Sequence, residues 1–108
     1  MITAGQIDEI VKILAEQCHP EKIILFGSHA RGGAREDSDL DLAIVKSSDL
    51  PPHKRSQEFR KALRSGGRRW YFGMDILVFT PEEIRELEKN PASLVYEIMK
   101  NGKTLYAS

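Results

Sequence analysis

Apolar and polar positions divide the 108 residues into segments of helical and strand type. Near the start of the chain, apolar residues recur at helical intervals: Ile7, Ile10, Val11, Leu14 and Cys18. Thr3 and Gln6 have the spacing of a capping box, and Pro20 follows the last apolar position, so we expect a helix between them. A β-rich apolar run from Lys22 to Phe26 is too short for a helix, and it predicts a buried strand.

Two later stretches alternate with the period of a strand. The first has Leu40, Leu42 and Ile44 on one face and Asp39, Asp41 and Ala43 on the other. The second runs from Tyr71 to Phe79, with an apolar face made by Phe72, Met74, Ile76 and Val78. Asp75 lies on the opposite face of this strand. A lone carboxylate in an apolar strand is costly to bury, so we expect Asp75 to be paired, hydrogen-bonded or bound to metal.

The remaining segments predict helices that cover a sheet. Three of them have helical spacing or start signals: 53–67 with Phe59, Ala62 and Leu63, 80–89 with a capping box at Thr80 and Glu83, and 90–102 with Leu94, Val95, Ile98 and Met99. Residues 103–106 add a short terminal strand. This order of elements predicts an α/β or α+β fold, formed by one domain over residues 1–108.

Sixteen basic and sixteen acidic residues cancel, which argues against binding of nucleic acid through overall charge. Between His53 and Arg69, however, seven Lys or Arg residues accompany one acid, Glu58. We interpret this basic segment either as a solvated helix face or as a surface for phosphates or an acidic partner. Cys18 is the single cysteine, and its place on an apolar stripe predicts a buried structural thiol. No stretch approaches the ~20 apolar residues that span a bilayer, so we expect a cytoplasmic protein.

Asp39 and Asp41 carry the first candidate chemistry. Side chains two positions apart in a strand point to the same face, about 7 Å apart at Cα. Two carboxylates on one face repel each other unless a cation compensates. If the second and third strands pair in register, Asp75 joins them. Oxygen ligands of this kind suit Mg²⁺ or Mn²⁺, which take further ligands from water and substrate phosphates, so the three carboxylates predict a metal-dependent nucleotide site.

The turn at Gly27 and Ser28 carries the second candidate chemistry. It offers backbone N–H groups and a hydroxyl at the start of a possible helical turn, a suitable arrangement for binding β and γ phosphates. Arg31, a few residues further on, is a candidate for an additional phosphate contact. Two metal ions near such a turn can activate an attacking hydroxyl and stabilise the charge on phosphorus and the leaving group.

These residues together resemble a known signature. Gly27-Ser28, ten further residues, Asp39-Leu40-Asp41 and a later Asp75 resemble the nucleotidyltransferase superfamily that includes DNA polymerase β. The strings LFGSHARG and SDLDLAIV, with the final KNGKTLYA, resemble the minimal nucleotidyltransferases, or MNT family, over essentially the whole chain. The resemblance implies a small mixed sheet flanked by helices, two bound Mg²⁺ ions, with Mn²⁺ as an alternative, and transfer of a nucleoside monophosphate from a triphosphate to a hydroxyl.

The resemblance also implies roles for individual residues. Gly27 and Ser28 match the phosphate-binding turn, and Asp39 and Asp41 match the metal ligands. Asp75 matches the third carboxylate, which binds metal and helps to deprotonate the acceptor hydroxyl.

Relatives of the MNT type are commonly antitoxins of toxin–antitoxin modules, each paired with a helical HEPN-domain toxin. The antitoxin adds AMP from ATP to a tyrosine of the toxin. We therefore expect an ATP-binding antitoxin that forms a hetero-oligomer with such a partner, without direct contact to nucleic acid or membrane. The resemblance does not include the helical second domain of larger members, which makes a wall supplied by the partner plausible.

Two other functions remain open on the sequence. The chain can neutralise a toxin by binding alone, with its motif serving only to hold nucleotide or having no remaining function. It can also act on a small molecule such as an aminoglycoside, although 108 residues are few for building an acceptor pocket without dimerisation. His29 is a weaker candidate for a nucleotide contact, and we interpret Trp70 and Tyr71 as packing residues at a strand entrance.

Overall fold

The structure is a computed structural model that describes residues 2–108. Its regular elements follow the order α1 (Ala4–Cys18), β1 (Lys22–Phe26), α2 (Ser28–Arg31), β2 (Leu40–Val45), η1 (Pro52–Lys54), α3 (Gln57–Arg64), η2 (Ser65–Gly67), β3 (Met74–Phe79), α4 (Pro81–Leu87), α5 (Leu94–Asn101) and β4 (Lys103–Ala107). The four strands of this part of the chain form one sheet in the order β3-β2-β1-β4. Strand β1 is antiparallel to β2 and β4, whereas β2 and β3 are parallel. The predicted fold class, a small mixed sheet flanked by helices, is therefore confirmed.

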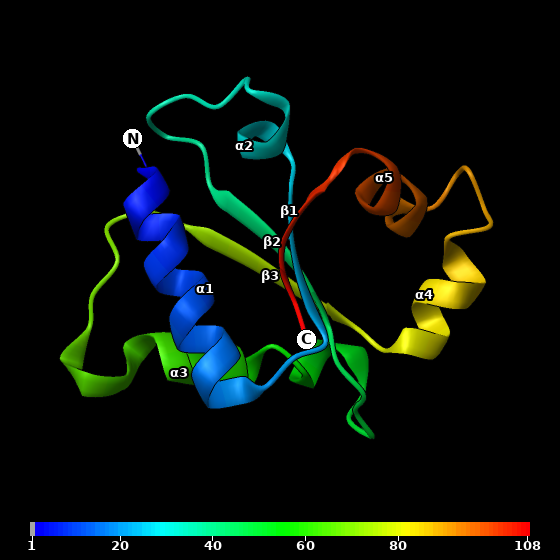
Figure 1. Ribbon diagram of the computed structural model, residues 1–108, viewed down its shortest axis with the longest axis horizontal. Helices are drawn as coiled ribbons and strands as arrows, with labels where there is room; N and C mark the ends of the chain where they lie inside the picture. Colours follow the sequence, from blue (N-terminus) through cyan, green and yellow to red (C-terminus); the bar gives the residue numbers. More distant parts are fainter. Residues whose placement is uncertain (1) are drawn as a thin grey trace.

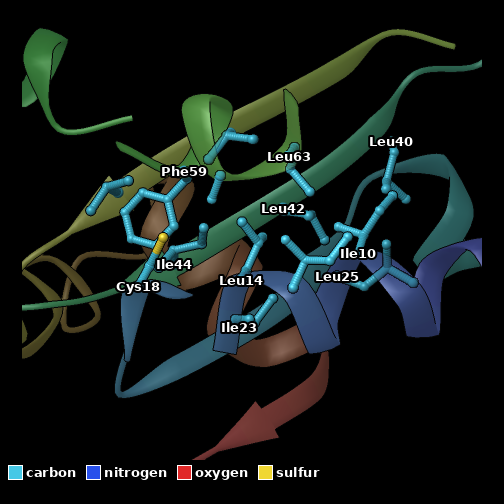
Figure 2. Close-up of a cluster of buried hydrophobic side chains, with 14 of the residues drawn as sticks. Ile10, Leu14, Cys18, Ile23, Leu25, Leu40, Leu42, Ile44, Phe59 and Leu63 are labelled. Carbon is cyan, nitrogen blue, oxygen red and sulfur yellow. The ribbon is translucent and has the colours of Figure 1, made fainter. Parts of the chain in front are cut away.

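The two faces of the sheet are covered by different helices. Figure 1 shows α1 and α3 on one side of the strands, with α4 and α5 on the other. The larger core lies under α1 and α3, and Figure 2 shows its central side chains: Ile10, Leu14, Cys18, Ile23, Leu25, Leu40, Leu42, Ile44, Phe59 and Leu63. Beneath α5 lies a smaller core of Ile24, Ala43 and Ile98. Cys18 is buried, and burial raises the pKa of its thiol, which confirms the structural interpretation.

Local chemistry explains several boundaries. The capping boxes at Thr3 with Gln6 and at Thr80 with Glu83 both form. The last helix starts differently from the prediction, because Ser93, rather than the Asn90-Pro91 pair, accepts a hydrogen bond from the Tyr96 N–H.

Two further boundaries depart from the prediction. Helix α4 ends at Leu87 rather than near Lys89, and β3 begins at Met74 rather than Tyr71. No helix within residues 2–108 has the length and apolar character required to cross a membrane.

Candidate active site

Strand pairing builds a row of side chains across one face of the sheet. Phe26 at the end of β1 is paired with Asp41 in β2, and Asp41 is paired with Asp75 in β3. The in-register pairing of β2 and β3, the condition under which Asp75 joins the other carboxylates, is therefore present. It brings together two carboxylates that are distant in sequence, and both lie on the face opposite to α1 and α3, because the alternate residues Leu42 and Ile76 are in the larger core.

Gly27 allows the Asp41 carboxylate to lie against the turn that follows β1. Its φ of 74° and ψ of −154° belong to a region that only glycine adopts readily. A Cβ atom placed on Gly27 would overlap the carboxylate of Asp41. The Ala30 and Arg31 N–H groups donate to the Gly27 carbonyl at 3.1 Å and close the turn. The predicted phosphate turn and the predicted metal ligand Asp41 are thus direct neighbours.

Gly73 plays the corresponding part for Asp39, and sequence reasoning did not assign it to the site. Asp39 precedes β2, which begins at Leu40, and the Leu40 N–H donates to the Gly73 carbonyl at 2.9 Å. A Cβ atom on Gly73 would overlap the Asp39 carboxylate. The available signal was a glycine two positions before Asp75, the single residue without a side chain in the predicted strand.

The carboxylates affect one another electrostatically. Burial raises the pKa of Asp41, and the negative charges of Asp75 and Asp39 raise it further. The charges of His29 and Arg31 lower the pKa of Asp41 and offset part of this rise. The Nε2 atom of His29 lies 3.4 Å from the Ser38 carbonyl oxygen, which ties α2 to the loop before β2.

The remaining predicted site residues lie around this row. Ser28 is the first residue of α2 and is half-buried, and Arg31 is the exposed last residue of the same helix. Gly27 and Arg31 also line a hollow of about 170 Å³ between α2 and α5. A larger hollow of about 410 Å³, with Lys22 and Val45 in its wall, lies at the far end of these strands, away from the carboxylates.

The donor set fits a hard divalent cation. Within residues 2–108, no group of three or more His, Cys, Asp or Glu side chains is placed to hold a metal ion, so the fit to a cation rests on the chemistry of the donors. Asp39, Asp41 and Asp75 supply only carboxylate oxygens, which are the ligands of Mg²⁺ and Mn²⁺. The two glycines keep space clear around two of these carboxylates. The pKa of Asp41 is raised first by burial and then by the negative charges of Asp75 and Asp39, which a bound cation would offset.

Two of the sequence interpretations near the site change. Tyr71 is 93% exposed, so its prediction as a packing residue is wrong, whereas Trp70 is half-buried and its Nε1 donates to the Leu63 carbonyl at 3.0 Å. In the basic segment, Arg55 is 8% exposed and pairs with Glu83. That residue belongs neither to a solvated face nor to a partner surface.

Known proteins share parts of this sequence and this fold. MJ0604 of Methanocaldococcus jannaschii, which has the provisional name of protein adenylyltransferase, is 57% identical over 30 residues. Those residues are 28% of this chain, and the match spans 30% of that relative's length.

Two solved structures share the fold. The crystal structure of a protein from Sulfolobus solfataricus, provisionally named a nucleotidyltransferase, has a TM-score of 0.60 at 20% sequence identity. The match covers 94% of this chain and 77% of that protein's chain. A crystal structure of a toxin-antitoxin with AMP-PNP has a TM-score of 0.60 at 23% sequence identity. The match covers 94% of this chain and 73% of that chain. The family described as "Polymerase beta, Nucleotidyltransferase" matches residues 8–108. The chain therefore belongs to the polymerase beta nucleotidyltransferase family.

Proposed function

We propose that this chain is a Mg²⁺-dependent nucleotidyltransferase that moves AMP from ATP to a protein hydroxyl, with residues 1–108 acting as one minimal nucleotidyltransferase domain. The observation that carries the proposal is the sheet register, which sets Asp41 beside Asp75 and against the turn at Gly27. Asp39 lies one residue before β2, over Gly73. This arrangement gathers phosphate-binding and carboxylate groups on one small surface.

In the proposed site, Asp39 and Asp41 would hold two Mg²⁺ ions and Asp75 would hold one of them, with Mn²⁺ as an alternative. The bound ions supply positive charge for the phosphates and lower the pKa of the attacking hydroxyl. Asp75 accepts the proton of the acceptor hydroxyl. The acceptor oxygen then forms a bond to the α-phosphorus, the bond from that phosphorus to the bridging oxygen breaks, and pyrophosphate leaves with the electron pair.

The turn after β1 orients the leaving group. The N–H groups of Ser28 and His29 precede the first intrahelical bond of α2 and are free to bind an anion. The Ser28 hydroxyl and the Arg31 guanidinium add a donor and a positive charge from the same turn. These groups hold the β and γ phosphates in line with the attacking oxygen, which is where positioning contributes most to the rate.

The identity of nucleotide and acceptor rests on the similar proteins. MJ0604 carries the name of protein adenylyltransferase, and a protein of the same fold is a toxin-antitoxin with AMP-PNP. These names support ATP as the donor and a toxin partner as the acceptor. In this proposal the chain is an antitoxin that modifies a tyrosine of a cognate HEPN-domain toxin.

The test is transfer of label from ATP carrying the label at the α-phosphate, in the presence of Mg²⁺ and the cognate HEPN-domain toxin of the proposal. Wild type should label the partner, and Asp39→Asn should lower the rate at least about 100-fold, as expected for loss of an essential site group. Asp49→Asn, an exposed acid in the loop after β2, is the matched control and should retain wild-type labelling.

Equal labelling by Asp39→Asn and wild type would exclude the proposed mechanism. If neither labels the partner, and an Asp39→Asn, Asp41→Asn double variant still protects cells, the chain acts as an antitoxin by binding alone.

A further inference from the structure

One exposed surface beside the site has no part in the mechanism above. Residues 68–72, here called the rim, run from Arg68 to Phe72 and lead directly into Gly73 and β3. Together with Gln6 and Glu9 of α1, the rim lines a hollow of about 300 Å³. Its most exposed member is Tyr71, at 93%.

The floor of the rim is fixed by contacts within the fold. The Trp70 Nε1 atom donates to the Leu63 carbonyl at 3.0 Å, and the Trp70 and Phe72 rings lie 5.9 Å apart between centroids. Both residues are half-buried and pack against the larger core. Tyr71 therefore stands on a rigid support. A rigid, exposed tyrosine presents a large contact area with little loss of side-chain entropy on binding.

The positive charges of the rim are available to a partner. Arg55 is bound to Glu83, and Arg60 donates to the Met74 carbonyl at 3.3 Å, so these two arginines of the basic segment serve the fold. Arg68 and Arg69 are exposed and form no ion pair with any acid among residues 2–108. The Arg68 Nη1 atom donates to the Ser65 carbonyl at 2.8 Å, which holds its guanidinium in place without neutralising it.

The rim is within reach of the reacting groups. Tyr71 lies two positions before Gly73, against which the Asp39 carboxylate lies, and four positions before Asp75. The extended chain spans at most ~3.6 Å per residue, so the Cα atoms of Tyr71 and Asp75 are no more than about 14 Å apart. The hollow is lined by α1, whereas Asp41 and Asp75 lie on the opposite face of the sheet, so a segment bound at the rim must pass around the start of β3 to place its hydroxyl at Asp75.

We propose that the rim is the docking surface for the acceptor protein, and that it binds an acidic segment next to the hydroxyl that receives AMP. This inference rests on the proposed function. Arg68 and Arg69 attract the acidic residues, and Tyr71 covers the apolar part of the segment. The positive charge of the hollow is confined to Arg68 and Arg69, with Glu9 in the same lining, which is too short a basic stretch for a polyphosphate backbone but sufficient for one or two acidic side chains.

The test uses two fluorescent peptides that each contain one tyrosine, flanked in one by Asp and Glu and in the other by Lys. Fluorescence anisotropy is measured with Mg²⁺ and without ATP. The acidic peptide should bind wild type more tightly than the Lys peptide, and the Arg68→Glu, Arg69→Glu variant should reverse this order, with at least a tenfold loss for the acidic peptide. A Lys22→Glu, Lys89→Glu variant reverses two exposed charges elsewhere and should bind like wild type.

A second pair of variants tests the tyrosine. Tyr71→Ala should weaken the acidic peptide severalfold, whereas Tyr71→Phe should retain most of the binding because it keeps the ring. Circular dichroism melts should agree among all variants, since each change is on the surface.

Several results would overturn the proposal. The first is that wild type and the Arg68→Glu, Arg69→Glu variant bind the acidic peptide equally well. The second is that neither peptide binds. The third is that wild type binds a single-stranded RNA of similar length more tightly than the acidic peptide. Failure of the proposed function is recognised separately. In that case the acidic peptide binds the rim as described, but no AMP is transferred to it when ATP is added.

Discussion

Two of the three carboxylates in the site depend on glycines for their position. Asp41 lies against Gly27, and Asp39 lies against Gly73, and at both positions a Cβ atom would occupy the space of the carboxylate. Gly27 belongs to the Gly27-Ser28 turn, which the sequence already indicates as a phosphate-binding turn. The role of Gly73 is visible only when the parallel register sets it opposite Asp39, because a glycine in a strand ordinarily indicates just weak packing or a bulge.

Substitution of Gly73 by alanine should move the Asp39 carboxylate. We expect the AMP transfer rate to fall by about 100-fold, the loss that a displacement of about 1 Å causes in a preorganised site. The Mg²⁺ concentration for half-maximal activity should rise as well, since a displaced ligand holds metal less well.

Gly33→Ala is the matched control for this change. No atom lies within 4 Å of a Cβ built on Gly33, so its transfer rate should stay near wild type. A Gly73→Ala protein with wild-type rate and Mg²⁺ dependence would show that Asp39 does not need this clearance.

At the scale of elements, α3 and the turn before it protect the open edge of the sheet. Strand β3 is an edge strand, and the carbonyl groups that point away from β2 lack a strand partner. The Arg55 Nη1 atom donates to the Val78 carbonyl at 3.3 Å, and the Arg60 Nη1 atom donates to the Met74 carbonyl at the same distance. Two arginines of the basic segment thus satisfy backbone groups of the edge.

Arg55 should be the most important of these residues for stability. It also donates to the Leu50 carbonyl at 2.9 Å and to the Glu83 carboxylate at 2.6 Å. Arg55→Ala should lower the free energy of unfolding by about 3 kcal/mol, the low end for a broken buried pair, as measured by urea denaturation. Lys54→Ala, its exposed neighbour, should change it by less than about 0.5 kcal/mol. Similar losses for the two variants would contradict the assigned role of Arg55.

The same pair predicts a pH dependence. Burial by itself would raise the pKa of Glu83, but hydrogen bonds from the Thr80 backbone and from Arg55 outweigh it and lower the pKa below its usual value. The stabilising contribution is therefore complete above the ordinary glutamate pKa and is lost as the pH falls through the lower folded value. The stability advantage of wild type over Glu83→Gln should shrink between pH 6 and pH 3 (about the titration range of carboxylates). An advantage that is constant over this range would exclude the pair as its source.

Elements with a local chemical signal were predictable, and those set by tertiary packing were not. The capping boxes at Thr3 and Thr80 fix helix starts with their own side chains. The Asn90-Pro91 signal misled because the Asn90 side chain accepts from the Ala92 N–H in a turn, and Ser93 then caps the helix. The exposure of Tyr71 and the burial of Arg55 depend on which surfaces α1 and β3 leave open. No pattern in the neighbouring sequence therefore indicates them.

At the scale of the whole molecule, the candidate site lies on the less covered face of the sheet. The face under α1 and α3 carries most of the buried apolar side chains, and the opposite face has the smaller core beneath α5. The alternation of Leu40, Leu42 and Ile44 with acidic and small residues predicted this asymmetry. The position of β4, which pairs with β1 on the side away from β2, could not be inferred from residues 103–106 alone, because a short strand can join either edge of a sheet.

Unequal cover of the two faces predicts unequal local stability. Helix α4 has no buried residue and Leu94 of α5 is 50% exposed, whereas Ile10, Leu14 and Phe59 are fully buried between α1, α3 and the sheet. Elements with few buried apolar contacts open without global unfolding. In native-state hydrogen exchange, we expect the amides of α4 to exchange at least about tenfold faster than those at the centre of α1, with β2 protected to the same level as α1. Equal exchange in α4 and α1 would mean that both faces unfold as one cooperative unit, and that the thinner cover of this face is not a source of local motion.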